Sequence, residues 1–197
     1  MRTLTTRLIV GRLLAVVAAI AVVTGSSAHA AVVSYSATLN GASESPPNGS
    51  AGIGAAQVDI DAVANTMRVR VTFGNLTGTS TASHIHAPTA VAGTGTAGVA
   101  TTTPTFAAFP LGVTSGAYDM TLDMTQASSY NPVFVTANGG TTASAEVALF
   151  QSIADGTAYL NIHSTVFPGG EIRGFLIPGI ATSTRGSSWG RIKDLYR

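Results

Sequence analysis

The chain has no cysteine among its 197 residues, which excludes both disulfide bonds and thiolate metal ligands. Charged residues are also scarce, because Asp, Glu, Lys and Arg together make up only 10% of the chain. The sequence holds no cluster of Lys and Arg that would neutralise phosphate groups, and we therefore expect no nucleic-acid partner. A folded domain of this composition depends on its hydrophobic core and hydrogen bonds for stability.

A hydrophobic run long enough to span a membrane is missing at the N-terminus. The run over residues 13–23 is shorter than the roughly 20 residues that a transmembrane helix needs. Three arginines precede this run, and the small residues Ala28-His29-Ala30 follow it. This arrangement predicts a secretory signal peptide over residues 1–30. We therefore expect a secreted or cell-surface protein with no transmembrane span in its mature chain. An uncleaved N-terminal anchor is the alternative interpretation.

Residues 31–177 have the pattern of one β-rich domain. Apolar and polar residues alternate in several short segments, as in half-buried strands, and Gly, Pro and Asn separate these segments. One segment differs, because Ala143, Val147, Phe150 and Ile153 recur at helical spacing. The pattern predicts an all-β fold, either an antiparallel immunoglobulin-like β-sandwich or a flattened barrel, with one short helix. The predicted strands cover residues 33–39, 56–61, 67–73, 81–87, 97–101, 118–122, 158–164 and 171–177.

The C-terminal residues 178–197 differ in composition from the domain. Residues 178–188 are mostly small and read as a linker, and a basic-aromatic tail follows. Trp189, Ile192 and Leu195 would share one side of a helix. The tail is interpreted either as a sorting or docking tag for the cell surface or as a chain end that packs against the domain.

Cleavage after Ala30 would leave three histidines, all within two predicted strands. Residues two apart on a strand point to the same face, so His84 and His86 would stand side by side while Ile85 faces the core. His163 lies in the second of these strands. If the two strands lie close together, the three imidazoles converge on one point. Imidazole nitrogens are good ligands for zinc and copper, so this pattern indicates a site for one such ion.

The fourth position of such a site has one main candidate. Glu171 follows His163 across a predicted hairpin and would serve as a ligand or would orient an imidazole. Glu44 is a weaker candidate, because its position depends on how its loop folds. The alternative is a purely structural network. In that case the histidines bond to backbone carbonyls, Asn161 and Ser164, and Glu171 pairs with Arg173 on the same strand.

Four segments in a fixed order resemble the CHRD domain, a module named for chordin and widespread in secreted bacterial proteins. The similarity spans residues 33–177 and ends in the string G-E-I-R-G. Two positions depart from the usual family pattern, since Ala87 follows the H-I-H string and Ser164 follows the last histidine. Neither departure removes a proposed ligand. The segments are Ala37–Gly41 with Glu44–Pro47, Phe73–Gly78, His84–His86, and Ala158–Ser164 with Pro168–Gly174.

The resemblance implies an extracellular immunoglobulin-like β-sandwich and no established reaction. We therefore expect a secreted or cell-surface binding or structural module whose partner lies outside the cell or in the cell envelope. The sequence assigns no catalytic residue and no organic cofactor, since it has no G-x-S-x-G motif and no phosphate-binding loop in the required context. The competing hypothesis is a mononuclear zinc or copper metalloprotein that activates water at an open coordination position.

Overall fold

The computed structural model describes residues 32–179. The signal peptide predicted over residues 1–30 and the tail from residue 180 onward lie outside this range and stay predictions. Within residues 32–179, no helix is long and apolar enough to cross a membrane. The fold contains eight strands and two α-helices: β1 (Val33–Asn40), β2 (Ile53–Asp61), β3 (Thr66–Gly74), β4 (Ser80–His86), β5 (Gly116–Asp123), α1 (Pro132–Ala137), α2 (Thr142–Ala154), β6 (Tyr159–Ser164), β7 (Ile172–Phe175) and β8 (Ile177–Pro178).

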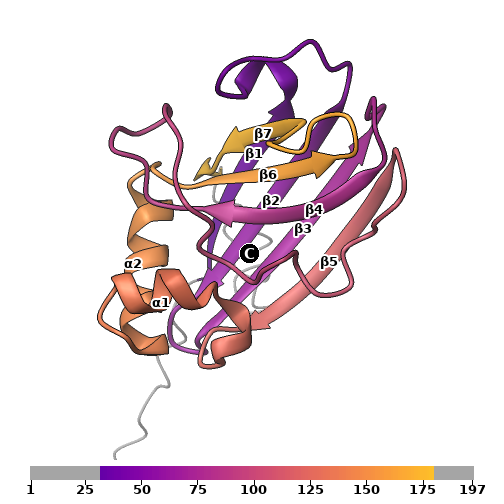
Figure 1. Ribbon diagram of the computed structural model, residues 1–197. Coiled ribbons are helices and arrows are strands. Elements are labelled where there is room, and N and C mark those ends of the chain that lie inside the picture. The colour runs from indigo at the N-terminus through magenta and orange to yellow at the C-terminus, as the bar shows by residue number, and fades with distance from the viewer. Residues whose placement is uncertain (1–31, 180–197) are drawn as a thin grey trace, which may run out of the picture.

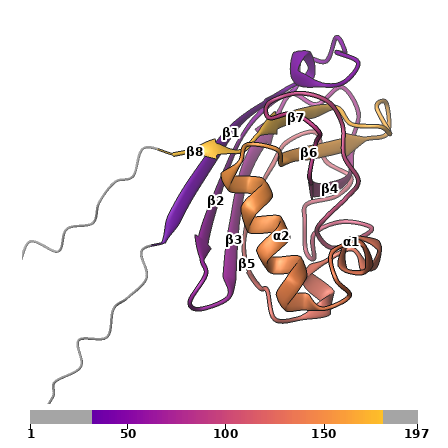
Figure 2. The same cartoon turned by 90° about the vertical axis from the view of Figure 1, so that its left-hand side faces the viewer.

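All eight strands belong to one sheet, in which every pair is antiparallel. The strand order is β4-β6-β7-β1-β2-β3-β5, and β8 pairs with β1. The sheet curls into a half-barrel, with the two helices side by side at one end (Figures 1 and 2). The all-β antiparallel prediction is therefore confirmed, and the half-barrel corresponds to the flattened-barrel form of that prediction.

The predicted helix is present as α2. Of the four residues expected on its apolar face, Ile153 is buried and Phe150 packs partly buried against the core, whereas Ala143 and Val147 are exposed. Thr141 caps its first turn by accepting from the backbone N–H of Ser144. Ala145, Leu149 and Ile153 are fully buried in the core, whereas Val147 is 71% exposed. Ala145, Leu149 and Ile153 are spaced four residues apart. Small residues lie between apolar ones on both sides of the helix, so the sequence pattern alone does not show which side is buried.

The strands β4, β6 and β7 place polar side chains opposite the core. Their registers pair His84 with Asn161, and Asn161 with Arg173. Because side chains alternate along a strand, Ile85, Leu160, Ile162 and Ile172 fill the core from the other face, and each is fully buried. The side of these three strands away from the core therefore carries the histidines.

Candidate metal centre

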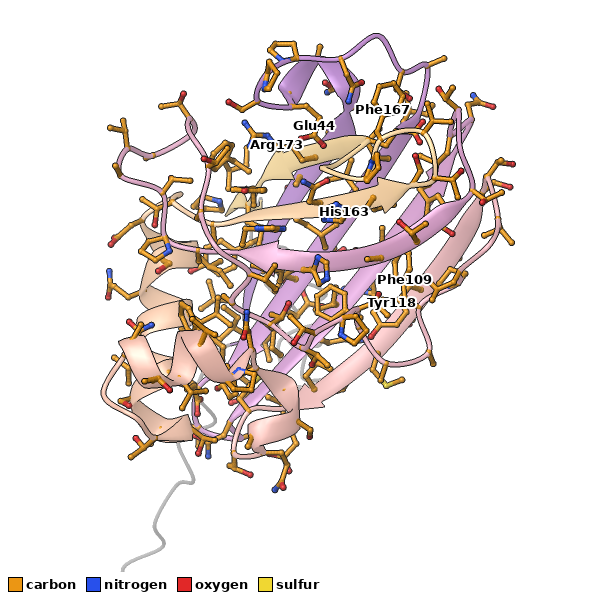
Figure 3. All side chains as sticks on the ribbon, viewed as in Figure 1. Glu44, Phe109, Tyr118, His163, Phe167 and Arg173 are labelled. Atoms are coloured by element: carbon orange, nitrogen blue, oxygen red, sulfur yellow. The ribbon has the colours of Figure 1, made fainter. Side chains whose placement is uncertain are left out.

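The fold brings the three predicted histidines together. His84 and His86 lie on β4, and His163 lies on the neighbouring strand β6, opposite Ala82. The ring centroid of His84 is 5.6 Å from that of His86 and 5.1 Å from that of His163. One nitrogen of each ring lies within 4.8 Å of the corresponding nitrogens of the other two. Figure 3 labels His163 on strand β6, which lies beside β4 in Figure 1.

The second nitrogen of each imidazole is held by a backbone carbonyl of a loop. His84 Nε2 lies 2.6 Å from the carbonyl oxygen of Pro104, and His86 Nδ1 lies 2.9 Å from that of Ala97. His163 Nδ1 lies 2.9 Å from the carbonyl oxygen of Pro168. A carbonyl only accepts hydrogen bonds, so each of these nitrogens carries the ring proton. In a neutral imidazole the remaining nitrogen then has a free lone pair, which is the state that binds metals.

The other nitrogen of each ring is unpaired. His84 Nδ1, His86 Nε2 and His163 Nε2 are buried, and none has a hydrogen-bond partner. An unpaired buried acceptor costs about 1–3 kcal/mol, so three at one point form an unusual arrangement. Outer hydrogen bonds that fix ring orientation and tautomer, as the loop carbonyls do here, are a regular feature of histidine metal sites.

Burial keeps all three imidazoles neutral. Desolvation lowers the pKa of His84, His86 and His163 below the ordinary value of 6.5. The effect is largest at His86, whose pKa falls to about 4, and the positive charge of Arg173 contributes to that shift. At neutral pH the site therefore offers three uncharged nitrogen donors with no proton to displace.

His86 is also held by an aromatic stack that the sequence analysis did not identify. Its ring lies parallel to that of Tyr159, with 4.8 Å between centroids and 5° between planes. The guanidinium of Arg173 lies 4.7 Å from the centroid of the same tyrosine. The Tyr159 hydroxyl accepts from the backbone N–H of Ala97, whose carbonyl binds His86. Tyr159, Asn161 and His163 occupy every second position of β6 and so lie on one face of the strand. This spacing is the sequence signal that places Tyr159 beside the histidines.

The structure does not place Glu171 in the group of converging nitrogens. Its fully buried carboxylate instead accepts hydrogen bonds from the Ser50 hydroxyl and from the backbone N–H groups of Thr77 and Gly78. Burial acts to raise the pKa of Glu171, but these bonds and one from Ser164 outweigh it and lower the pKa. The carboxylate joins three segments of the chain: the loop after β1, the loop after β3 and the start of β7.

Glu44 lies beside Arg173 and is also outside the converging group. Its carboxylate is 3.8 Å from the Arg173 side chain, and both residues are buried. Burial raises the pKa of Glu44 to about 7, although the charge of Arg173 opposes this shift. Figure 3 shows the two side chains next to each other above β7. The sequence-based pairing of Arg173 with Glu171 is thus replaced by a pairing with Glu44.

Comparisons with known proteins agree with the resemblance found in the sequence. The CHRD domain matches residues 35–176, which is most of the chain. No curated protein and no solved structure matched the chain. The matched range begins in β1 and ends just after β7, so it includes the three histidines and the buried glutamates. The chain belongs to the CHRD domain family.

Proposed function

We propose that this CHRD domain protein is exported and acts at or outside the cell surface as a binding module that holds one zinc or copper ion. The ligands are His84, His86 and His163. The observation that carries the proposal is the convergence of three unpaired, buried and neutral imidazole nitrogens within 4.8 Å of one another. One bound cation satisfies all three at once.

The hydrogen bonds around the rings support metal binding over a purely structural network. A network that served only to hold loops would use both nitrogens of each ring, because unpaired buried acceptors are destabilising. Here each ring uses one nitrogen and leaves the other buried without a hydrogen-bond partner. Bond lengths of about 2.0–2.1 Å to a central ion require the three nitrogens to approach to roughly 3.4 Å. Side-chain adjustments of about 1 Å achieve this.

The proposed architecture places export and display at the two ends of the chain. A signal peptide over residues 1–30 directs export, residues 31–177 form the metal-binding domain, and the linker and tail over 178–197 act as a sorting tag. The absence of cysteine suits such a domain, because neither its fold nor its ligand set depends on the redox state of a thiol. The same ligand set with an added water would give the metalloenzyme alternative, for which no substrate-binding residues are identified.

Elemental analysis tests the metal site directly. The protein is purified without a histidine tag, incubated with zinc or copper ions, freed of unbound metal and analysed by mass spectrometry. We expect one equivalent of metal in the wild type and less than about a tenth in His86→Gln and His163→Gln, since losing one of three ligands removes several kcal/mol of binding. Thr81→Ser, at an exposed position on the same strand as His84 and His86, is the control and retains the full equivalent. Metal-free wild type, or full occupancy in His163→Gln, refutes the proposal.

A further inference from the structure

The ligand set of the proposed site is small and uncharged. The converging group contains three imidazoles and no carboxylate from the described residues. Both nearby glutamates have other partners, since Glu171 binds Ser50, Thr77 and Gly78, and Glu44 pairs with Arg173. The protein therefore offers three neutral donors, one fewer than tetrahedral zinc or tetragonal divalent copper takes.

Solvent access to the donors is also restricted. His84 and His86 are only 6% and 8% exposed, and the three converging nitrogens are themselves shielded from solvent. A catalytic zinc site completes its four-coordinate shell with water, and a structural zinc site does so with a fourth protein ligand. Among the described residues, no cysteine, aspartate or glutamate joins the three histidines as a fourth ligand.

The electrostatic environment disfavours a doubly charged ion. The guanidinium of Arg173 lies 4.7 Å from the centroid of the Tyr159 ring, which stacks on the ring of His86 with 4.8 Å between centroids. Coulomb repulsion from this guanidinium is twice as large for a divalent ion as for a monovalent one. The cost of burying an ion among neutral donors also rises steeply with its charge. The Glu44 carboxylate, 3.8 Å from the Arg173 side chain, offsets only part of the Coulomb repulsion, because its raised pKa of about 7 leaves it partly protonated at neutral pH.

We propose that the site selects monovalent copper, bound by His84 Nδ1, His86 Nε2 and His163 Nε2 in a three-coordinate arrangement. This inference rests on the proposed metal site and specifies its occupant. Monovalent copper has a filled d shell, needs no fourth ligand and carries a single charge, so it fits both the ligand count and the surroundings of the cluster. Neutral imidazoles are suitable donors for it.

Competition titrations measure the selectivity. Cu(I) is titrated anaerobically in the presence of a chromophoric Cu(I) chelator, and Zn(II) in the presence of a zinc-binding dye. We expect Cu(I) to bind at one equivalent and more tightly than Zn(II) by roughly a thousandfold or more. Zn(II) would lack a fourth ligand in this site, and its double charge is repelled more strongly by Arg173. X-ray absorption of the copper-loaded protein should show the edge feature of three-coordinate Cu(I), with nitrogen neighbours only.

Variants of Arg173 test the contribution of charge. Arg173→Gln removes the positive charge and should reduce the ratio of Cu(I) to Zn(II) affinity by roughly tenfold. The loss of Coulomb repulsion increases the affinity for the divalent ion more than the affinity for the monovalent one. Arg173→Lys is the matched control, since it also loses the planar guanidinium contacts but keeps the charge, and its ratio should stay near the wild-type value. The affinity ratio is informative even if both variants are less stable, because a general loss of order at the site weakens the binding of both metals.

The outcomes separate this inference from the proposed function. If neither metal binds at one equivalent, the metal site itself is refuted. If Zn(II) binds at one equivalent through the histidines and as tightly as Cu(I), the site stands and the selectivity for monovalent copper is refuted. A four-coordinate copper spectrum, or an unchanged affinity ratio in Arg173→Gln, likewise overturns the inference. One equivalent of tightly bound, three-coordinate Cu(I) supports it.

Discussion

Replacement of Glu171 by Gln should be among the most destabilising conservative substitutions in this protein. The carboxylate accepts two backbone N–H groups and one hydroxyl in a fully buried position. An amide has one acceptor oxygen, so at least one of these donors faces an NH2 group, and the remaining bonds lose their ionic character. Hydrogen bonds to a charged group contribute about 1.5–3 kcal/mol each, and an unpaired buried donor costs about 1–3 kcal/mol. We therefore expect a loss of about 3–4 kcal/mol.

Urea denaturation followed by circular dichroism measures this loss, and thermal unfolding should show a Tm lower by about 6–14 °C. Glu146→Gln is the matched control, because it makes the same change at a buried carboxyl group on α2. Burial raises the pKa of Glu146, so a neutral side chain suits that position, and its loss should stay below about 1 kcal/mol. If the two variants are equally stable, the bonds assigned to the Glu171 carboxylate do not hold the three segments together.

The pH dependence of the same variant gives a second check. The pKa of Glu171 is lower in the folded protein than its ordinary value of 4.5. Its contribution is therefore complete above about pH 4.5 and is lost as the pH falls through the folded pKa. The difference in unfolding free energy between wild type and Glu171→Gln should be constant from pH 8 to about pH 5 and should shrink below that. A difference that grows on acidification contradicts this assignment.

Three further predictions concern the core, the hairpin and the metal. Ile85→Asp should prevent stable folding at 37 °C by placing a charge at a fully buried position, whereas Thr81→Ser should shift Tm by less than about 2 °C; equal Tm values contradict the β4 assignment. Gly174→Ala should cost about 3 kcal/mol in urea titrations, because a Cβ atom there meets the backbone carbonyl of Thr38; a neutral result means that β1 and β7 separate easily. Metal affinity should begin to weaken at a lower pH than it would for imidazoles with the ordinary pKa of 6.5, because the lowered pKa values of the histidines reduce competition from protons; a tenfold loss already at pH 6.5 in dye-competition titrations contradicts their burial.

The sequence was sufficient to predict the fold class and to identify the three histidines as a candidate cluster, conditional on the pairing of their strands. Period-two alternation defined β1, β2 and β3, and the H-x-H spacing placed His84 and His86 on one face because strand geometry leaves no other choice. The position of His163 followed from the strand pattern together with the family resemblance. These inferences rely on local rules that tertiary context rarely changes.

The surroundings of the site were beyond sequence-based prediction. Glu171 was expected near the histidines because it follows His163 across the hairpin. Gly170, directly before it, has a φ of 137°, a backbone conformation that the strand pattern does not predict. The loop carbonyls of Ala97 and Pro104 carry no side-chain signal, and the long connection between β4 and β5 has no periodic pattern that fixes its path. The charge environment of His86 likewise depends on Arg173, which the sequence placed with a different carboxylate.

The loop that binds His84 and His86 also closes the outer edge of β4. Ala100 and Phe106 donate backbone N–H groups to the carbonyls of Ile85 and Ser83, which would otherwise be free at the end of the sheet. A free edge of this kind invites pairing with a strand from another molecule. Detachment of this loop from β4 would therefore break the hydrogen bonds between the histidine rings and the loop carbonyls. The same event would expose a strand edge that is prone to aggregation.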